Sequence, residues 1–159
     1  LWRVYHGELD GYKAEEVVLM IGTNNIGINN DNEIVEGIRF LLSAIRQRQP
    51  EAKIKVIGIL PRRNQEERVR NLNLRIRQMV ETGWYTFKNP GTKLLQEDGK
   101  INESLFSDGL HPNEEGYKQI VDETRPLSDS PLLTNQSQQH TQRRLCRQAN
   151  VLHTRILPE

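Results

Sequence analysis

The chain has 159 residues, enough for one folded domain with a core of its own. Its 22 basic and 21 acidic residues leave a formal net charge of +1, so nothing in the charge points to nucleic acid or an anionic membrane as the main partner. The single cysteine, Cys146, excludes an internal disulfide and a multi-cysteine zinc site, and it is compatible with either the cytoplasm or export.

The first part of the chain predicts a buried strand and then a helix. The apolar run 16–21 is closed by Gly22 and is typical of a strand buried on both faces, as in a parallel sheet. Asn30 or Asp31 can cap the helix that follows. Its apolar residues recur at helical spacing and predict one buried face: Ile34, Ile38, Leu41, Leu42 and Ile45.

The strand–helix order then repeats, and a third strand follows. The run 54–60 predicts a second buried strand, and Asn64 can cap a long polar helix after it. The apolar stripe of that helix is Val69, Leu72, Ile76 and Val80. Residues 84–87 predict a short third strand, residues 98–110 a loop, and Pro112 opens a last helix.

This order of elements predicts an α/β sandwich with a parallel sheet and right-handed crossovers. In such sheets the chemistry lies beyond the carboxyl ends of the strands. The composition changes near residue 122, because residues 122–159 contain no aromatic residue and no glycine. We therefore expect one folded domain over residues 1–125 and a disordered tail over residues 126–159.

The first candidate site follows the first predicted strand. Gly22 allows the backbone to turn sharply, and Asn24 and Asn25 bring amide donors to this end of the sheet. A side-chain N–H placed there can stabilise a developing oxyanion, which is worth about 3–4 kcal/mol in comparable sites. The alternative is an asparagine-rich turn without chemistry, since asparagine favours turns.

The second candidate site is the stretch 108–112. An aspartate three residues before a histidine on a tight turn can place the Asp108 carboxylate against the His111 imidazole. The carboxylate then fixes the tautomer and leaves the other ring nitrogen free as a general base. Pro112 holds the histidine at the edge of the next helix. The alternative is an aspartate turn with a surface histidine.

The remaining histidines, His6, His140 and His153, have no such setting, and we expect them to be solvated or structural. We expect no metal, because His111 has no companion ligand at a helical or hairpin spacing. We also expect no cofactor. A nucleotide-binding flavodoxin-like protein is disfavoured because the sequence contains no glycine-rich phosphate loop.

Taken together, these blocks resemble the SGNH (GDSL) hydrolases. The likeness rests on Gly-Thr-Asn-Asn at 22–25 after a strand, a second strand that ends in Gly-Ile-Leu-Pro-Arg at 58–62, and Asp-x-x-His at 108–111 before a helix. The opening Leu1-Trp2-Arg3 and the stretch 7–25 are most similar to the branch related to the catalytic subunits of platelet-activating-factor acetylhydrolase. The resemblance covers roughly residues 1–121.

The resemblance implies a three-layer α/β/α, flavodoxin-like sandwich and hydrolysis of a carboxylic ester through an acyl-serine. It gives Asn24 the role of oxyanion donor, and Asp108 and His111 the roles of acid and base in the triad. Gly22 matches the glycine of the same block as Asn24, whereas Asn25 stands where many members have aspartate. The implied substrate is a small-molecule, carbohydrate or lipid acyl ester, and related subunits associate as dimers, so a homodimer is also implied.

The sequence departs from the family at the nucleophile. In the family that serine lies in a Gly-Asp-Ser block on the first strand, and a second block supplies an oxyanion glycine; both precede the residues of this sequence. We therefore expect a sandwich without its first strand, with an open apolar edge, and a chain without useful esterase activity of its own. None of the serines present has the family's setting: Ser43, Ser104, Ser107, Ser128, Ser130 and Ser137.

Three functions stay open from the sequence. The first is the C-terminal part of an SGNH-type ester hydrolase that retains its base and oxyanion donor. The second is a catalytically inactive interaction or dimerisation protein on the same fold. The third is an esterase acting on acetylated sugars, for which Trp84 and Tyr85 could line a site, although we expect them to pack in the core. No apolar run approaches the ~18 residues that cross a bilayer, so no membrane segment is expected.

Overall fold

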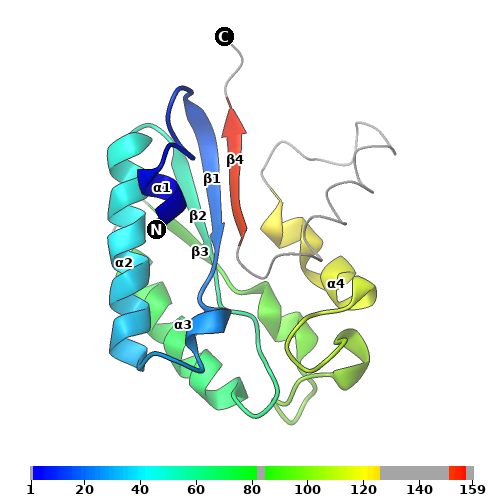
Figure 1. Ribbon diagram of the computed structural model, residues 1–159. Helices are drawn as coiled ribbons and strands as arrows, with labels where there is room; N and C mark the ends of the chain where they lie inside the picture. The colour runs from blue at the N-terminus through cyan, green and yellow to red at the C-terminus, as the bar shows by residue number, and fades with distance from the viewer. Residues whose placement is uncertain (1, 82–84, 126–150, 157–159) are drawn as a thin grey trace.

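In the computed structural model, three strands run parallel at the centre of the molecule (Figure 1). The structure describes residues 2–81, 85–125 and 151–156. Strand β1 (Ala14–Met20) pairs with β2 (Lys53–Ile57), and β2 pairs with β3 (Tyr85–Lys88). All but one of the β1 residues are buried, as the apolar run predicts for a strand covered on both faces.

One face of the sheet is covered by α2 (Asp31–Arg48) and α3 (Glu66–Glu81), and the short α1 (Trp2–Tyr5) lies beside α2 (Figure 1). Val17 and Leu19 of β1 point into this core. The apolar stripes predicted for both helices are buried there: Ile34, Ile38, Leu41, Leu42, Ile45, Val69, Leu72, Ile76 and Val80. Burial of one such side chain contributes about 1.5–3 kcal/mol. Because this core contains more buried apolar side chains than the core on the opposite face, it supplies most of the apolar stabilisation.

The opposite face is covered by α4 (Glu114–Thr124) together with two 3₁₀ helices, η2 (Pro90–Leu94) and η3 (Glu103–Leu105). Val18 and Met20, which alternate with the side chains of the first core, pack on this side. The two cores and the sheet between them make three layers. The predicted three-layer α/β/α arrangement is therefore confirmed.

An ion pair is buried within the second face. Lys55 Nζ lies 3.3 Å from Glu16 Oε1 and donates a hydrogen bond of 2.9 Å to the backbone carbonyl of Arg125. Both charged side chains are almost fully buried, on strands whose sequence runs suggested only apolar packing. Since Arg125 directly follows α4, the Lys55 ammonium ties the carboxyl end of that helix to the sheet, where its charge also suits the helix dipole.

Asparagine caps one helix on each face of the sheet, α2 and α4. The Asn30 side chain accepts from the Glu33 backbone N–H at 3.0 Å, and the Glu33 carboxylate accepts from the Asn30 N–H at 2.9 Å, which completes a capping box at the start of α2. Asn113 caps α4 by accepting from Gly116 N–H at 3.0 Å. Asn30, one of the two predicted caps, is therefore confirmed.

Some predicted boundaries differ from the structure. Asn64 does not cap α3, because it adopts a left-handed backbone (φ 63°) in the turn before the helix, which begins at Glu66. Pro112 precedes the true cap of α4 and lies outside the helix. The second strand ends at Ile57, before the predicted end, and Trp84 lies outside the described residues.

The edge of the sheet beside β1 differs most from the sequence prediction. Strand β4 (Val151–Ile156) pairs antiparallel with β1 from Ala14 to Met20, as Figure 1 shows. The sequence predicted an open edge here and a disordered tail over residues 126–159. Residues 126–150 and 157–159 lie outside the described residues, but β4 belongs to the sheet. Its backbone hydrogen bonds occupy the edge of β1, which would otherwise be unpaired.

Candidate active site

The turn at residues 108–111 closes around one carboxylate. Asp108 Oδ1 accepts hydrogen bonds from the backbone N–H groups of Leu110 (2.9 Å) and His111 (2.7 Å). Asp108 Oδ2 lies 2.7 Å from His111 Nδ1. The His111 backbone, then its imidazole and the Leu110 backbone hold the pKa of Asp108 well below its usual range. An ionised carboxylate only accepts, so Nδ1 carries the hydrogen and Nε2 is the basic nitrogen.

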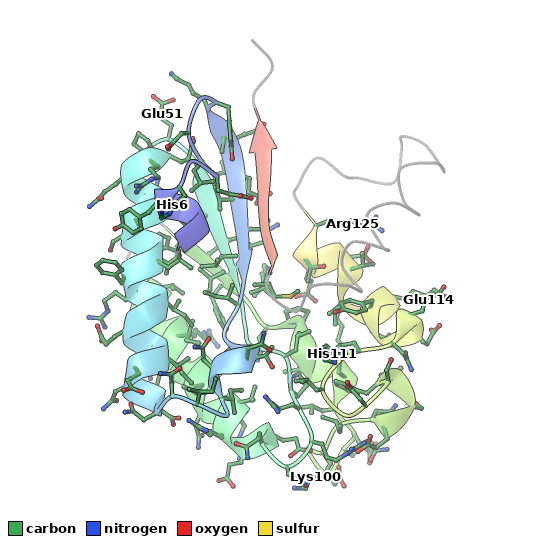
Figure 2. The ribbon with its side chains drawn as sticks, viewed as in Figure 1. His6, Glu51, Lys100, His111, Glu114 and Arg125 are labelled. Atoms are coloured by element: carbon green, nitrogen blue, oxygen red, sulfur yellow. The ribbon has the colours of Figure 1, made fainter. Side chains whose placement is uncertain are left out.

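His111 lies at the end of the sheet where β1, β2 and β3 terminate, close to the start of α4 (Figure 2). Its side chain is about half exposed. No described residue forms a hydrogen bond with Nε2. The ring borders a small apolar hollow of about 20 Å³, which has room for about one water molecule. Thr23, Ile59 and Leu60 line the same hollow. The imidazole therefore lies at the edge predicted for chemistry, with Nε2 unbonded to any described residue.

The backbone turns sharply where β1 ends. Gly22 has φ 111°, in the left-handed region, and any Cβ there would lie 2.9 Å from Ile59 Cδ1. Only glycine fits both conditions. It leads into η1 (Thr23–Asn25), whose first residue is buried against the hollow next to His111. Asn24 follows directly. The predicted role of Gly22 as a turn residue is thereby given a physical basis.

The two asparagines of η1 are used differently. Asn25 Nδ2 donates to Asn29 Oδ1 at 2.9 Å, and Asn29 Nδ2 donates in turn to Glu33 Oε2 at 3.2 Å. Asn25 thus belongs to the network that caps α2. The Asn24 side chain is exposed, and within the described part of the chain nothing forms a hydrogen bond with it. Of the two, Asn24 has the amide that is available to a ligand.

An arginine that the sequence analysis missed holds the loop between η1 and α2. Arg68 donates from Nη1 to the Ile26 carbonyl (2.5 Å), from Nη2 to the Asn29 carbonyl (2.7 Å) and from Nε to Asp31 Oδ1 (2.7 Å). The three partners surround one half-buried guanidinium on the first turn of α3. Arg68 lies 37 to 42 residues from its partners, so no local pattern in the sequence indicates it.

Two further arginines, Arg62 and Arg63, lie a few residues after the end of β2. Arg62 Nη1 donates to the Thr23 carbonyl at 3.0 Å, and the Arg63 backbone N–H donates to the Gly109 carbonyl at 2.8 Å. Arg62 belongs to the 58–62 block that the sequence analysis identified, but its contact with Thr23 was not predicted. The structure thus links both candidate blocks to the same short segment.

The structure brings the two predicted blocks to one hollow through Thr23 and His111. The Asp108–His111 pair is formed with the predicted geometry, at 2.7 Å. The convergence of the Asn24 amide on the same point stays a prediction. Tyr85 packs against the first core, as expected, and its ring lies 5.8 Å from the Arg46 guanidinium carbon.

None of the described serines forms a hydrogen bond with the His111 imidazole. Ser43 lies on α2, in a groove shared with α3 and β3. Ser104 Oγ donates to Asn102 at 2.7 Å, and Ser107 contacts the His111 carbonyl only through its backbone N–H, at 2.9 Å. The other three serines fall outside the described residues: Ser128, Ser130 and Ser137.

The other ionisable groups that the structure describes include no metal-binding cluster. Where the structure describes side chains, no three histidine, cysteine, aspartate or glutamate residues are grouped closely enough to hold a metal ion. His6 lies in the turn after α1, His140 is outside the described residues, and only the backbone of His153, in β4, is described. Within the described residues, no helix has both the length and the apolar character to span a membrane.

The fold and this turn define the class: a flavodoxin-like α/β sandwich with an aspartate–histidine pair beyond the carboxyl ends of its parallel strands. A family model described as "GDSL-like Lipase/Acylhydrolase family" matches residues 1–119. The chain belongs to the GDSL-like lipase/acylhydrolase family. The resemblance expected from the sequence is confirmed.

Curated relatives agree with this assignment, and a solved structure shares the fold. The alpha2 subunit of human platelet-activating factor acetylhydrolase IB is 33% identical over 139 residues, covering 81% of this chain and 57% of that protein. The bovine alpha1 subunit is 30% identical over 127 residues, covering 76% and 53%. The crystal structure of a GDSL-like lipase from Bacteroides thetaiotaomicron superposes with a TM-score of 0.57 at 22% identity, covering 67% of this chain and 58% of the lipase. The chain therefore spans somewhat more than half the length of these proteins.

Proposed function

We propose that Asp108, His111 and Asn24 form part of an ester-hydrolase site, with His111 as its base and Asn24 as its oxyanion donor. The observation that carries the proposal is the 2.7 Å contact between Asp108 and His111 Nδ1, with Nε2 left free at the end of the sheet. In this role His111 Nε2 takes the proton from a nucleophilic hydroxyl, and Asp108 stabilises the resulting imidazolium. Asn24 donates its amide N–H to the oxyanion of the tetrahedral intermediate.

The substrate class that fits is a carboxylic acyl ester. The charge of an ester carbonyl oxygen grows during attack, and a free amide donor together with a free imidazole base suits that change. The family assignment, a lipase/acylhydrolase family, supports the same class, and so does the human relative, which is named as a platelet-activating factor acetylhydrolase subunit. The apolar walls of the hollow beside His111 suit an acyl methyl group better than a charged one.

The nucleophile is the part that these 159 residues do not supply in our proposal. They contain no Gly-Asp-Ser triplet, and no described serine is bonded to His111. Loss of a triad serine costs on the order of 10⁶ in turnover, and ~10³–10⁴ over water remains from the other groups. We therefore expect the 159-residue chain to show no useful turnover by itself.

The test is hydrolysis of p-nitrophenyl acetate by the 159-residue chain, by His111→Ala and by Asn24→Ala. Free imidazole groups also cleave this ester slowly, so His6→Ala is the matched control for a histidine outside the site. We expect a slow, non-saturable rate that falls more in His111→Ala than in His6→Ala, because Asp108 stabilises the imidazolium that forms at His111. Saturable turnover that disappears in both His111→Ala and Asn24→Ala would refute the absence of a nucleophile and establish the chain as a complete enzyme.

A second candidate function is a catalytically inactive partner protein on the same fold. It is favoured by the same observation, that no described serine is bonded to His111. Size-exclusion chromatography with light scattering separates the candidates, because an inactive partner that has been retained for association forms a defined dimer. A monomer at micromolar concentration would remove this candidate.

A further inference from the structure

Arg62 and Arg63 lie between the two halves of the proposed site. They follow Leu60 and Pro61, where the chain leaves β2 along the wall of the hollow. Arg62 reaches the β1 side, where its guanidinium donates to the Thr23 carbonyl at 3.0 Å. Arg63 reaches the opposite side, where its backbone N–H donates to the turn that carries His111. One dipeptide therefore contacts both halves.

Arg63 also fixes the turn through its side chain. Its guanidinium lies directly against Gly109, because a Cβ at that glycine would be 2.6 Å from Arg63 Cζ. The guanidinium is held in this place by a two-bond fork to Glu103, with Nε to Oε1 and Nη2 to Oε2 both at 2.7 Å. Such a fork sets the plane of the guanidinium as well as its position. The turn is thus enclosed between Arg63 and its own hydrogen bonds.

Besides holding the Arg63 guanidinium, Glu103 affects the Asp108–His111 pair. The attraction of Asp108 contributes to raising the pKa of Arg63, after the hydrogen bonds and charge of Glu103, so the guanidinium lies within reach of the Asp108 field. Both Arg63 donors that face Glu103 are nevertheless occupied by it. Asp108 is left to His111 and Leu110. Glu103 therefore directs two of the Arg63 donors away from the Asp108 carboxylate.

We propose that Arg62 and Arg63 are positioning residues, which fix the Asn24 loop and the Asp108–His111 turn relative to each other. Arg62 acts through Thr23, the residue before Asn24. Arg63 acts through Gly109 and depends on Glu103. The inference rests on the proposed function, because it assigns a role to residues that support the same site.

The first test reads the tautomer of His111 directly from the nitrogen chemical shifts of the labelled chain. In the wild type we expect the proton on Nδ1, held by Asp108. In Arg63→Ala the turn loosens, and we expect the ratio of the Nδ1–H to the Nε2–H form to fall about fivefold, which is about 1 kcal/mol at 25 °C. Arg70→Ala is the matched control, since Arg70 is an exposed arginine of α3 that pairs with Glu67. It should leave the ratio unchanged.

The second test removes the two-bond fork by changing Glu103, the partner of Arg63. Glu103→Gln keeps the size of the side chain but frees the guanidinium, and we expect the same fall in the ratio. Arg63→Lys retains the charge without the fork, so it should not restore the wild-type tautomer ratio.

For the Asn24 half, Arg62→Ala should speed hydrogen exchange of the Ile26 amide, which donates to the Thr23 carbonyl, and Arg62→Lys should restore protection. Thermal unfolding of each variant shows that it is folded.

The outcomes separate the two proposals. A wild-type His111 without the Nδ1–H tautomer would contradict the proposed function, because its base would then not be formed. If the wild type has the Nδ1–H tautomer and both Arg63→Ala and Glu103→Gln keep the wild-type ratio, the positioning role of Arg63 is overturned. The proposed function is not affected by that result. Unchanged exchange of Ile26 in Arg62→Ala would overturn the role of Arg62.

Discussion

The two halves of the candidate site are held in place by different means. The Asp108–His111 turn is closed by hydrogen bonds between residues two and three positions apart. The loop that carries Asn24 is held instead by Arg62 and Arg68, which lie about 40 residues further along the chain. The turn is therefore closed mainly by its own local hydrogen bonds, with Arg63 as its support from elsewhere in the chain, whereas the loop depends on the docking of β2 and α3.

The largest difference in stability effect between the two halves is expected for substitution of their glycines, Gly22 and Gly109. Gly22→Ala forces a left-handed backbone on alanine, about 1–3 kcal/mol, and presses the new Cβ against buried Ile59, about 1–3 kcal/mol more. Gly109→Ala has the same backbone cost, but its new Cβ meets the half-exposed end of Arg63 rather than a buried core side chain. Urea unfolding should therefore show a loss of about 2–6 kcal/mol in the free energy of unfolding for Gly22→Ala and a smaller loss for Gly109→Ala.

Gly27→Ala is the control for these glycine variants. Gly27 lies in the same loop as Gly22, but it has no positive φ and its Cβ would meet nothing within 4 Å. We expect its free energy of unfolding to stay within about 0.5 kcal/mol of the wild type. Equal losses for all three variants would contradict the contrast drawn between the halves.

The next largest effect is expected for the arginine that clamps the loop. Arg68→Ala removes three hydrogen bonds and leaves the Ile26 and Asn29 carbonyls without their partner, at a cost of about 2–3 kcal/mol. Arg70→Ala, on the exposed side of the same helix, should change the free energy of unfolding by less than about 0.5 kcal/mol. In Arg68→Ala the amide shifts of the 108–111 turn should stay at their wild-type values, since that half closes on itself.

Smaller effects follow at the helix caps beside each half. Asn30→Ala and Asn113→Ala should each lower the free energy of unfolding by about 1 kcal/mol, as cap removals do. The loss should be greater for Asn113, because its Nδ2 also donates to the Ser104 carbonyl at 2.7 Å. Chemical denaturation of the two variants side by side measures the difference. A larger loss for Asn30 would show that the loop side relies on its cap more than the turn side does.

The smallest effect is the pH dependence of the turn, because Asp108 is half exposed and solvent screens its charge. Its hydrogen bonds lower the folded-state pKa below the unfolded value of about 3.9. The stability that they supply is present above that value and is lost as the pH falls toward the folded-state pKa. The difference in the free energy of unfolding between the wild type and Asp108→Asn should therefore narrow below about pH 3.9. A constant difference from pH 7 to acid would contradict this.

The helices of the fold could be predicted from apolar periodicity, but the residues at which they begin and end could not be predicted as well. Apolar spacing placed α2 and α3 and their buried stripes, because a helix shows one face to the core every 3.6 residues. The start of α3 was misplaced because Asn64 suits both a cap and a left-handed turn, and only the backbone path decides between them. Lys55 was hidden in an apolar run, since its partner Glu16 lies on another strand.

By itself the sequence determined the sandwich and the Asp108–His111 pair, because helical periodicity and a three-residue turn are local properties of the chain. Only the tertiary structure decided that β4 pairs with β1, that Arg68 clamps the Asn24 loop, and that Arg62 and Arg63 contact both halves. These contacts join residues about 40 or more positions apart. Their partners are set by how the strands and helices dock, and no spacing within the chain specifies them.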